Sequence, residues 1–229
     1  MERTQQHIPF FETLWIGCLL AIGGGFLDAY TYQLHGHVFA NAQTGNLVLL
    51  GIQMANGHFL TALYYLIPII AFIAGILLTE LIKRHGNFRW ILWQHLALCF
   101  EIMLLLGIGF LPLSLPDSIV NVTVSFICAI QVNSFAMLHG ASYATTMCTG
   151  NLRSGTRCFF QFLAEKDREA GKQSLRYFTI LACFCGGAAL GVFLSALWLE
   201  KAVWVCCGIF LAVLVSSFVV RHCGHAVRS

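Results

Sequence analysis

Long apolar runs dominate the chain, and short polar stretches separate them. A helix needs about twenty mostly apolar residues to cross a bilayer. Six runs meet that requirement, at 13–33, 60–82, 90–111, 118–139, 177–199 and 203–220. Two segments, 36–57 and 141–164, are more polar, and whether they cross completely stays open. The pattern predicts an all-α integral membrane protein with six transmembrane helices and two short interrupted or re-entrant helical segments.

The composition agrees with one membrane domain over residues 1–229. Hydrophobic residues make up 58% of the chain and charged residues only 10%, whereas a soluble domain carries roughly a quarter charged residues. The net charge of +3 is too small and too scattered to indicate a nucleic-acid partner. The expected partners are the lipid bilayer and a small solute or ion, and a homo-oligomer stays open.

The distribution of basic residues predicts a multi-pass protein of a bacterial inner membrane, with both termini cytoplasmic. With six crossings, the inner loops contain most of the basic residues, namely Lys83, Arg84, Arg89, Arg153, Arg157, Lys166, Arg168, Lys172, Arg221 and Arg228. The outer loops contain little that is basic except Lys201. This arrangement follows the positive-inside bias, whereas eight full crossings would place Lys83 and Arg84 outside.

Two halves of the chain share a pattern. The same offset of 105 residues separates Asp28 from Asn133 and the Thr-Gly-Asn tripeptide at Thr44 from the one at Thr149. These matches predict an internal duplication, with repeats at about 12–111 and 117–221. Because each half contains three crossings, the second copy would lie upside down in the membrane, as in many transporters.

The Thr-Gly-Asn tripeptides predict the starts of two half-helices, with Thr44 and Thr149 as N-caps. Such starts would direct free amides and a positive helix end toward the protein centre, where an anion or a polar group can bind. Alternatively, each tripeptide is only a turn before a capped helix. The candidate substrate-binding residues are Asp28, Asn41, Gln43, Thr44, Gly45, Asn46, Asn133, Thr149, Gly150, Asn151 and Arg153.

Two acidic residues lie inside predicted spans, Asp28 in the first and Glu101 near the middle of the third. A carboxyl group at that depth is costly and must face protein or water. Apolar surroundings favour its protonated form, so both residues, with His95 nearby, are candidates for proton or cation coupling. By contrast, His35 at the outer end of the first span is expected to be solvated.

Other polar, basic and glycine residues in or near the predicted spans either allow two interpretations or concern helix packing alone. Asn121, Ser125 and Asn133 form a polar stripe that either lines a pathway or makes interhelical hydrogen bonds. Arg153 either attracts an anionic substrate or extends to lipid headgroups. Gly187 and Gly191 form a small-residue seam that predicts a close helix crossing.

Three stretches identify a resemblance to a known family. They are Gly-Gly-Phe-Leu-Asp-Ala-Tyr at 24–30, Phe-Ala-Asn-Ala-Gln-Thr-Gly-Asn at 39–46 and Thr-Gly-Asn-Leu at 149–152. They resemble the YoaK-like family of bacterial transmembrane proteins, a domain of unknown function. The resemblance implies a six-helix inner-membrane protein and supplies no substrate.

The sequence therefore predicts a small secondary transporter or channel for a small polar or anionic solute. The sequence contains no H-E-x-x-H motif, no G-x-S-x-G elbow and no P-loop, so we expect no enzyme. The sequence has no C-x-x-C pair and most of its cysteines lie in apolar runs, so we expect no metal and no cofactor. The alternatives are an accessory or sensor subunit and, less favoured, an intramembrane enzyme.

Overall fold

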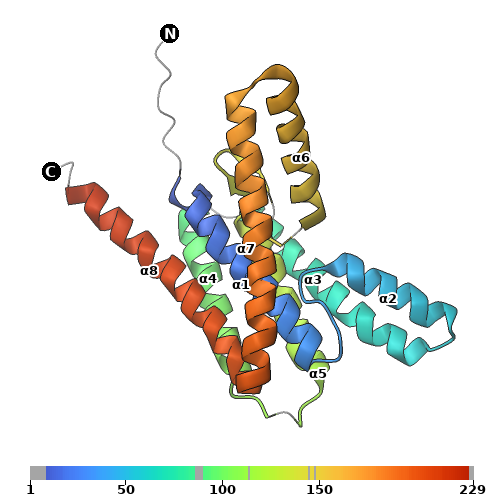
Figure 1. The fold of residues 1–229 in the computed structure, drawn as a ribbon. Coiled ribbons are helices and arrows are strands. Elements are labelled where there is room, and N and C mark those ends of the chain that lie inside the picture. Colours follow the sequence, from blue (N-terminus) through green and yellow to red (C-terminus); the bar gives the residue numbers. More distant parts are fainter. Residues whose placement is uncertain (1–8, 86–89, 113, 144, 147, 227–229) are drawn as a thin grey trace.

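The computed structural model describes residues 9–85, 90–112, 114–143, 145–146 and 148–226, with side chains from 9–84, 93–112, 114–143, 145–146 and 148–220. In these residues the chain is almost entirely helical (Figure 1). The helices are α1 (Leu14–Leu34), α2 (Gln43–Ala55), α3 (Phe59–His85), α4 (Trp90–Ile108), α5 (Asp117–Ser134), α6 (Cys148–Glu165), α7 (Arg168–Trp198) and α8 (Trp204–Ala226). Two 3-10 turns, η1 (Phe10–Glu12) and η2 (Leu199–Val203), and a hairpin of β1 (Met137–Leu138) and β2 (Ala141–Ser142) complete the described structure.

Each of the six long apolar runs forms a helix, although α7 begins nine residues before the predicted 177 and the predicted end of the fourth run is wrong. The run at 118–139 was expected to be helical throughout, but α5 ends at Ser134. The chain then turns into the hairpin, where His139 and Gly140 have positive φ values of 49° and 76° that a helix cannot contain. The sequence after Ser134 is apolar enough for a span, so hydropathy alone did not indicate this turn.

The two more polar segments form the shorter helices α2 and α6, which pack against α3 and α7 respectively. The prediction that Thr44 and Thr149 are N-caps is wrong, because α2 begins at Gln43 and α6 at Cys148. Both threonines therefore lie inside the first helical turn. The N-cap of α2 is Ala42, whose side chain makes no capping hydrogen bond.

Close crossings of α1 with α7 and of α3 with α5 form the centre of the bundle. The predicted small-residue seam is confirmed, because a Cβ atom at Gly187 would overlap the backbone of Ile22, and one at Gly191 would lie 2.7 Å from the carbonyl oxygen of Phe26. Helix α1 is largely enclosed by its neighbours, since two thirds (67%) of its apolar stretch is buried. Helix α4 packs on α5 and α8, and α8 also contacts α1.

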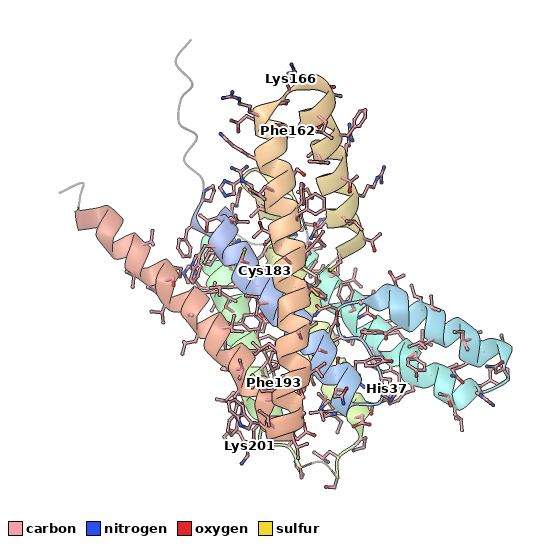
Figure 2. The ribbon with its side chains drawn as sticks, viewed as in Figure 1. His37, Phe162, Lys166, Cys183, Phe193 and Lys201 are labelled. Atoms are coloured by element: carbon pink, nitrogen blue, oxygen red, sulfur yellow. The ribbon has the colours of Figure 1, made fainter. Side chains whose placement is uncertain are left out.

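Large apolar side chains project outward from the bundle. They include Leu77 on α3, Phe193 on α7 and Val215 on α8, each at least half exposed. In Figure 2, Lys166 and Lys201 lie beyond opposite ends of α7, with Phe193 on the stretch between them. Within the described residues, three helical stretches are long and apolar enough to cross a membrane: 14–34, 59–84 and 168–220, the last of which contains both α7 and α8. The structure is thus that of an all-α membrane protein, whose exposed apolar surface matches lipid rather than water.

Candidate functional site

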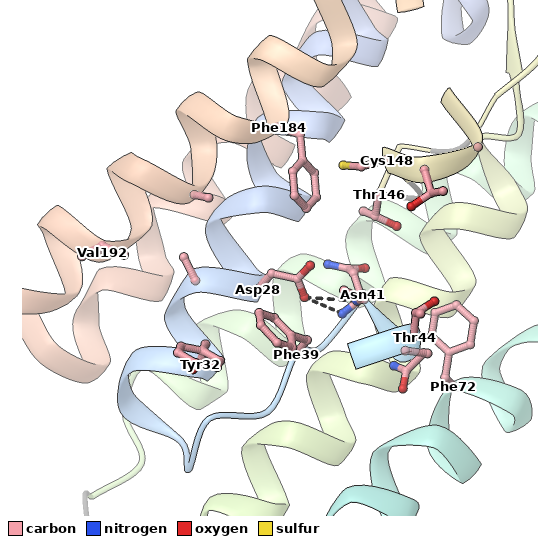
Figure 3. A pocket seen from close by; sticks show the side chains of 16 residues that line it. Asp28, Tyr32, Phe39, Asn41, Thr44, Phe72, Thr146, Cys148, Phe184 and Val192 are labelled. Carbon is pink, nitrogen blue, oxygen red and sulfur yellow. Dashed lines mark hydrogen bonds between the residues drawn. The ribbon is translucent and has the colours of Figure 1, made fainter. Parts of the chain in front are cut away.

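A cavity of about 530 Å³ lies where the first turns of α2 and α6 approach α1 (Figure 3). The lining residues come from α1, the segment before α2, α3, the start of α6 and α7. They are Asp28, Ala29, Tyr32, Phe39, Asn41, Ala42, Gln43, Thr44, Phe72, Thr146, Cys148, Thr149, Gly150, Phe184, Ala188 and Val192. Two helix starts that are far apart in the sequence therefore meet at one site.

Asp28 is the charged residue of this cavity and is only 5% exposed. Its Oδ1 atom accepts hydrogen bonds from the backbone amides of Asn41, at 2.6 Å, and Ala42, at 3.4 Å (Figure 3). These amides directly precede the first helical residue of α2. A carboxyl group from α1 thus holds the two residues that lead into α2.

Two buried side-chain oxygens in the cavity have no hydrogen-bond partner among the described residues: Oδ1 of Asn41 and Oγ1 of Thr146. Each residue is 4% exposed. The Asn41 Nδ2 atom donates to the carbonyl oxygen of Gly24 at 3.1 Å, and the Thr146 side chain packs on the same glycine. The sulfur of Cys128 also lies beside the Asn41 side chain. Because buried polar atoms are normally paired, these two oxygens indicate a place for a ligand.

Aromatic side chains form the walls of the cavity, and reasoning from the sequence missed them. Tyr32 stacks on Phe39 with ring centroids 4.8 Å apart, while Phe72 comes from α3 and Phe184 from α7. A signal for the last two did exist, because Phe72-Ile73-Ala74-Gly75 and Phe184-Cys185-Gly186-Gly187 occupy matching places in the two halves. The same matching pairs Thr146 with Asn41 and Cys148 with Gln43, each 105 residues apart.

Six of the predicted binding residues line the cavity: Asp28, Asn41, Gln43, Thr44, Thr149 and Gly150. Three others lie just behind it. Gly45 packs on the Phe39 ring, and Asn151 is 3% exposed in the first turn of α6. Asn46 donates to the carbonyl oxygen of Phe39 at 2.6 Å and accepts from its amide at 3.1 Å. The asparagine of the first tripeptide therefore holds the loop before α2 in place.

Two predicted binding residues lie outside the cavity. The Asn133 Nδ2 atom donates to Glu80 Oε1 at 2.8 Å, and its Oδ1 accepts from Lys83 Nζ at 3.1 Å. Because α5 ends one residue after Asn133, this residue does not occupy the place that Asp28 has on α1. Arg153 is exposed on the surface of α6 and does not line the cavity.

The coupling candidates Glu101 and His95 also lie away from the cavity. Glu101 is 2% exposed, and its two carboxylate oxygens accept from Gln131 Nε2 at 2.9 and 3.0 Å. The sequence did not single out Gln131. Nε2 of His95 lies 2.7 Å from Ser217 Oγ. Glu101 is therefore a buried carboxyl group that is paired with the Gln131 amide and is separate from the Asp28 site.

A polar cluster forms where α1, α5 and η2 end or begin. His35 is 3% exposed, so the expectation that it is solvated is wrong. Its Nδ1 atom lies 3.1 Å from Asp117 Oδ1. Its Nε2 atom lies 3.2 Å from Glu200 Oε2, which is within ion-pair distance but lacks the geometry of a hydrogen bond. Asn121 donates to the carbonyl oxygen of His35 at 2.9 Å. For Asn121, therefore, the structure supports the interpretation that the polar stripe makes interhelical hydrogen bonds.

Comparison with known proteins agrees with this architecture. Residues 16–216 match a family described as "Protein of unknown function (DUF1275)". The chain is 28% identical over 196 residues to the UPF0700 transmembrane protein YoaK of Bacillus subtilis (strain 168). The aligned region covers 82% of this chain and 86% of that protein. No solved structure matches. The predicted resemblance is thereby confirmed, and the chain belongs to the DUF1275 family of membrane proteins.

Proposed function

We propose that this protein is a small secondary transporter or channel, not an enzyme, and that the cavity at Asp28 binds its solute. One observation carries the proposal: the starts of α2 and α6 meet at a cavity that contains Asp28 and two buried oxygens without partners. Irregular backbone in a membrane protein is tolerated where it is buried in protein or lines a wet cavity. Sites of this kind, at interrupted helices, are typical of secondary transporters.

The pattern of helix contacts supports an inverted repeat, which we propose as part of the same function. If α1–α4 correspond to α5–α8, the contact of α1 with α7 corresponds to that of α5 with α3. The contact of α2 with α3 likewise corresponds to that of α6 with α7, and α1 with α8 to α5 with α4. Gly75 and Gly187, matched in sequence, both pack against the backbone of the opposite half, at Phe126 and Ile22. A duplication explains these correspondences.

Helices α1 and α5 run in opposite directions. The end of α1 lies beside the start of α5, as the 3.1 Å contact of His35 with Asp117 indicates. At the other end, the ring of Phe11 lies 5.4 Å from that of Phe135, and the amide of His139 donates to Glu12 at 2.9 Å. Helices α1 and α5 are thus antiparallel, which is what an inverted repeat requires.

Six crossings of a bacterial inner membrane, with both termini cytoplasmic, fit the same contacts. His35, Asp117 and Glu200 belong to three connections that this topology puts outside, and they meet in one cluster. Glu12 meets Gly140 on the side that the topology puts inside. The orientation was predicted from the basic residues of the inner loops. Of these, Arg89 and Arg228 lie outside the described residues, as does the side chain of Arg221.

The proposal is tested with purified full-length protein in proteoliposomes, by uptake of amino acids, organic anions and metal cations. Asp28→Asn and Thr44→Ala change cavity residues. Asp167→Asn and Thr179→Ala are matched controls, because Asp167 is exposed, Thr179 is half-buried, and both lie outside the cavity. We expect one solute class to enter, and only the two cavity variants to lose uptake. If no solute binds or enters, transport is rejected and an accessory subunit becomes the better interpretation.

A further inference from the structure

The two helix starts in the cavity differ in electrostatic environment. The start of α2 faces Asp28, whose Oδ1 atom already accepts from the amides of Asn41 and Ala42. The start of α6 brings Cys148, Thr149 and Gly150 to the cavity. Asp28 is the one acidic residue in the lining, and its hydrogen bonds go to the residues before α2, so its carboxylate is not bonded to the positive end of α6.

Space is available at the start of α6. A Cβ atom at Gly150 would have no atom within 4 Å outside its own helix, so a ligand can approach the backbone of the first turn. The side chain of Arg153 is exposed and lies outside the lining. An anionic group bound here would therefore rely on the helix start and on the Thr149 side chain, and a carboxylate suits such a site.

Three acceptors gather at another part of the cavity. Gly24 and Asp28 lie one turn apart on the same face of α1, and the side chains of Asn41 and Thr146 both contact Gly24. The acceptors are the carboxylate of Asp28 and the partnerless oxygens of Asn41 and Thr146. An ammonium group carries three donors and one positive charge, which matches this set.

The rest of the lining is apolar. The rings of Tyr32, Phe39, Phe72 and Phe184, with Ala188 and Val192, surround the polar groups. Aromatic faces favour a nearby cation and an aliphatic group equally well. A cavity of about 530 Å³ falls in the usual range for small-molecule sites.

From the unequal helix starts and the partnerless oxygens, we propose that the cavity binds a zwitterionic amino acid with an apolar side chain. The ammonium group lies at Asp28, Asn41 and Thr146, the carboxylate at the start of α6, and the side chain among the aromatic rings. This inference rests on the proposed function only in taking the cavity as the solute site.

Leucine and two analogues that each lack one of its charged groups test the assignment in binding measurements on the full-length protein in nanodiscs. Leucine carries both charged groups, 3-methylbutan-1-amine lacks the carboxylate and 4-methylpentanoate lacks the ammonium group. We expect leucine to bind, and each of the other two to bind at least about tenfold more weakly, since a lost charge-assisted hydrogen bond has about that effect. If the amine binds as tightly as leucine, the carboxylate site at α6 is wrong. If the acid does, the ammonium site is wrong.

A pair of isosteric variants makes the test specific to the cavity. Thr146→Val removes a partnerless oxygen from the lining, whereas Thr145→Val removes a buried, partnerless hydroxyl that does not line the cavity. We expect leucine affinity to fall about tenfold in the first variant and to stay unchanged in the second. Equal effects would overturn the assignment. If no apolar amino acid binds but a solute of another class in the uptake screen does, the amino-acid assignment is wrong and the proposed function stands. If nothing binds or enters, both are wrong.

Discussion

The Oδ1 atom of Asp28 lies 2.6 Å from the backbone nitrogen of Asn41. This bond joins the middle of the central helix α1 to the residues that lead into α2, so one carboxyl group both shapes the cavity and faces it. Its two roles can be separated by substitution. An asparagine keeps an acceptor oxygen at this place but loses the charge, whereas a leucine loses both.

Asp28→Asn is therefore expected to reduce solute binding about tenfold or more while the fold survives. Asp28→Leu leaves the amides of Asn41 and Ala42 without an acceptor, and each buried unsatisfied group costs about 1–3 kcal/mol. Thermal unfolding in detergent and solute binding, measured side by side, distinguish the two variants. Unchanged binding by Asp28→Asn would remove this residue from the site.

Glu101 is expected to act in coupling rather than in solute binding, because it is buried and lies outside the cavity. In Glu101→Gln the new amide oxygen still accepts from Gln131, so the packing is kept. We expect solute exchange across proteoliposomes to persist and accumulation driven by a proton gradient to disappear. Glu80→Gln is the control, because Glu80 is exposed and pairs with Lys83 at the end of α3. Normal accumulation by Glu101→Gln would show that protons are not coupled here.

Cys148 offers a test of the cavity with a native side chain. Its half-buried thiol lines the cavity, whereas Cys206 is fully buried between helices, with 0% exposure. We expect a small polar thiol reagent to modify Cys148 much faster than Cys206, and bound solute to slow the reaction at Cys148. Peptide mapping by mass spectrometry measures both rates. Equal rates would mean that water does not reach the cavity.

Gly187 and Gly186 form a matched pair for the crossing of α1 with α7. A Cβ atom at Gly187 would overlap the carbonyl group of Ile22, whereas one at Gly186 would meet no atom within 4 Å outside its own helix. Gly187→Ala is expected to destabilise the protein by about 1–3 kcal/mol or more through overpacking. Gly186→Ala should be neutral or stabilising by up to about 1 kcal/mol, because alanine favours helix. Detergent unfolding titrations would contradict the crossing if both variants behaved alike.

His35 joins three connections that the proposed topology puts on one side of the membrane. His35→Gln retains one donor nitrogen where the ring presents two nitrogens to Asp117 and Glu200, so one of the two carboxylates loses its contact with residue 35. We expect a loss of about 1–3 kcal/mol in stability. Glu200→Gln should cost more than Asp117→Asn, because the Asp117 side chain is 42% exposed and that of Glu200 only 11%. The reverse order in thermal unfolding would argue against a buried cluster.

Hydropathy predicted where the long helices lie because burial in lipid depends on the length of an apolar run, a property of the sequence alone. It did not predict the end of α5 at Ser134. That end depends on a hairpin whose positive-φ residues, His139 and Gly140, occur in a stretch that is otherwise apolar enough for a span. Similarly, the burial of His35 depends on acidic residues 82 and 165 positions further along the chain.

The sequence by itself determined the membrane class from its apolar runs and the family from three short stretches. It also indicated the two helix starts that face the cavity, because repetition at a constant offset marks equivalent positions. Only the tertiary structure separated Asn133 and Arg153 from Asp28 and added the rings of Tyr32 and Phe39. The reason is geometric. A repeat shows which residues correspond, but where each helix ends and at which point two helices cross decide which side chains share a cavity.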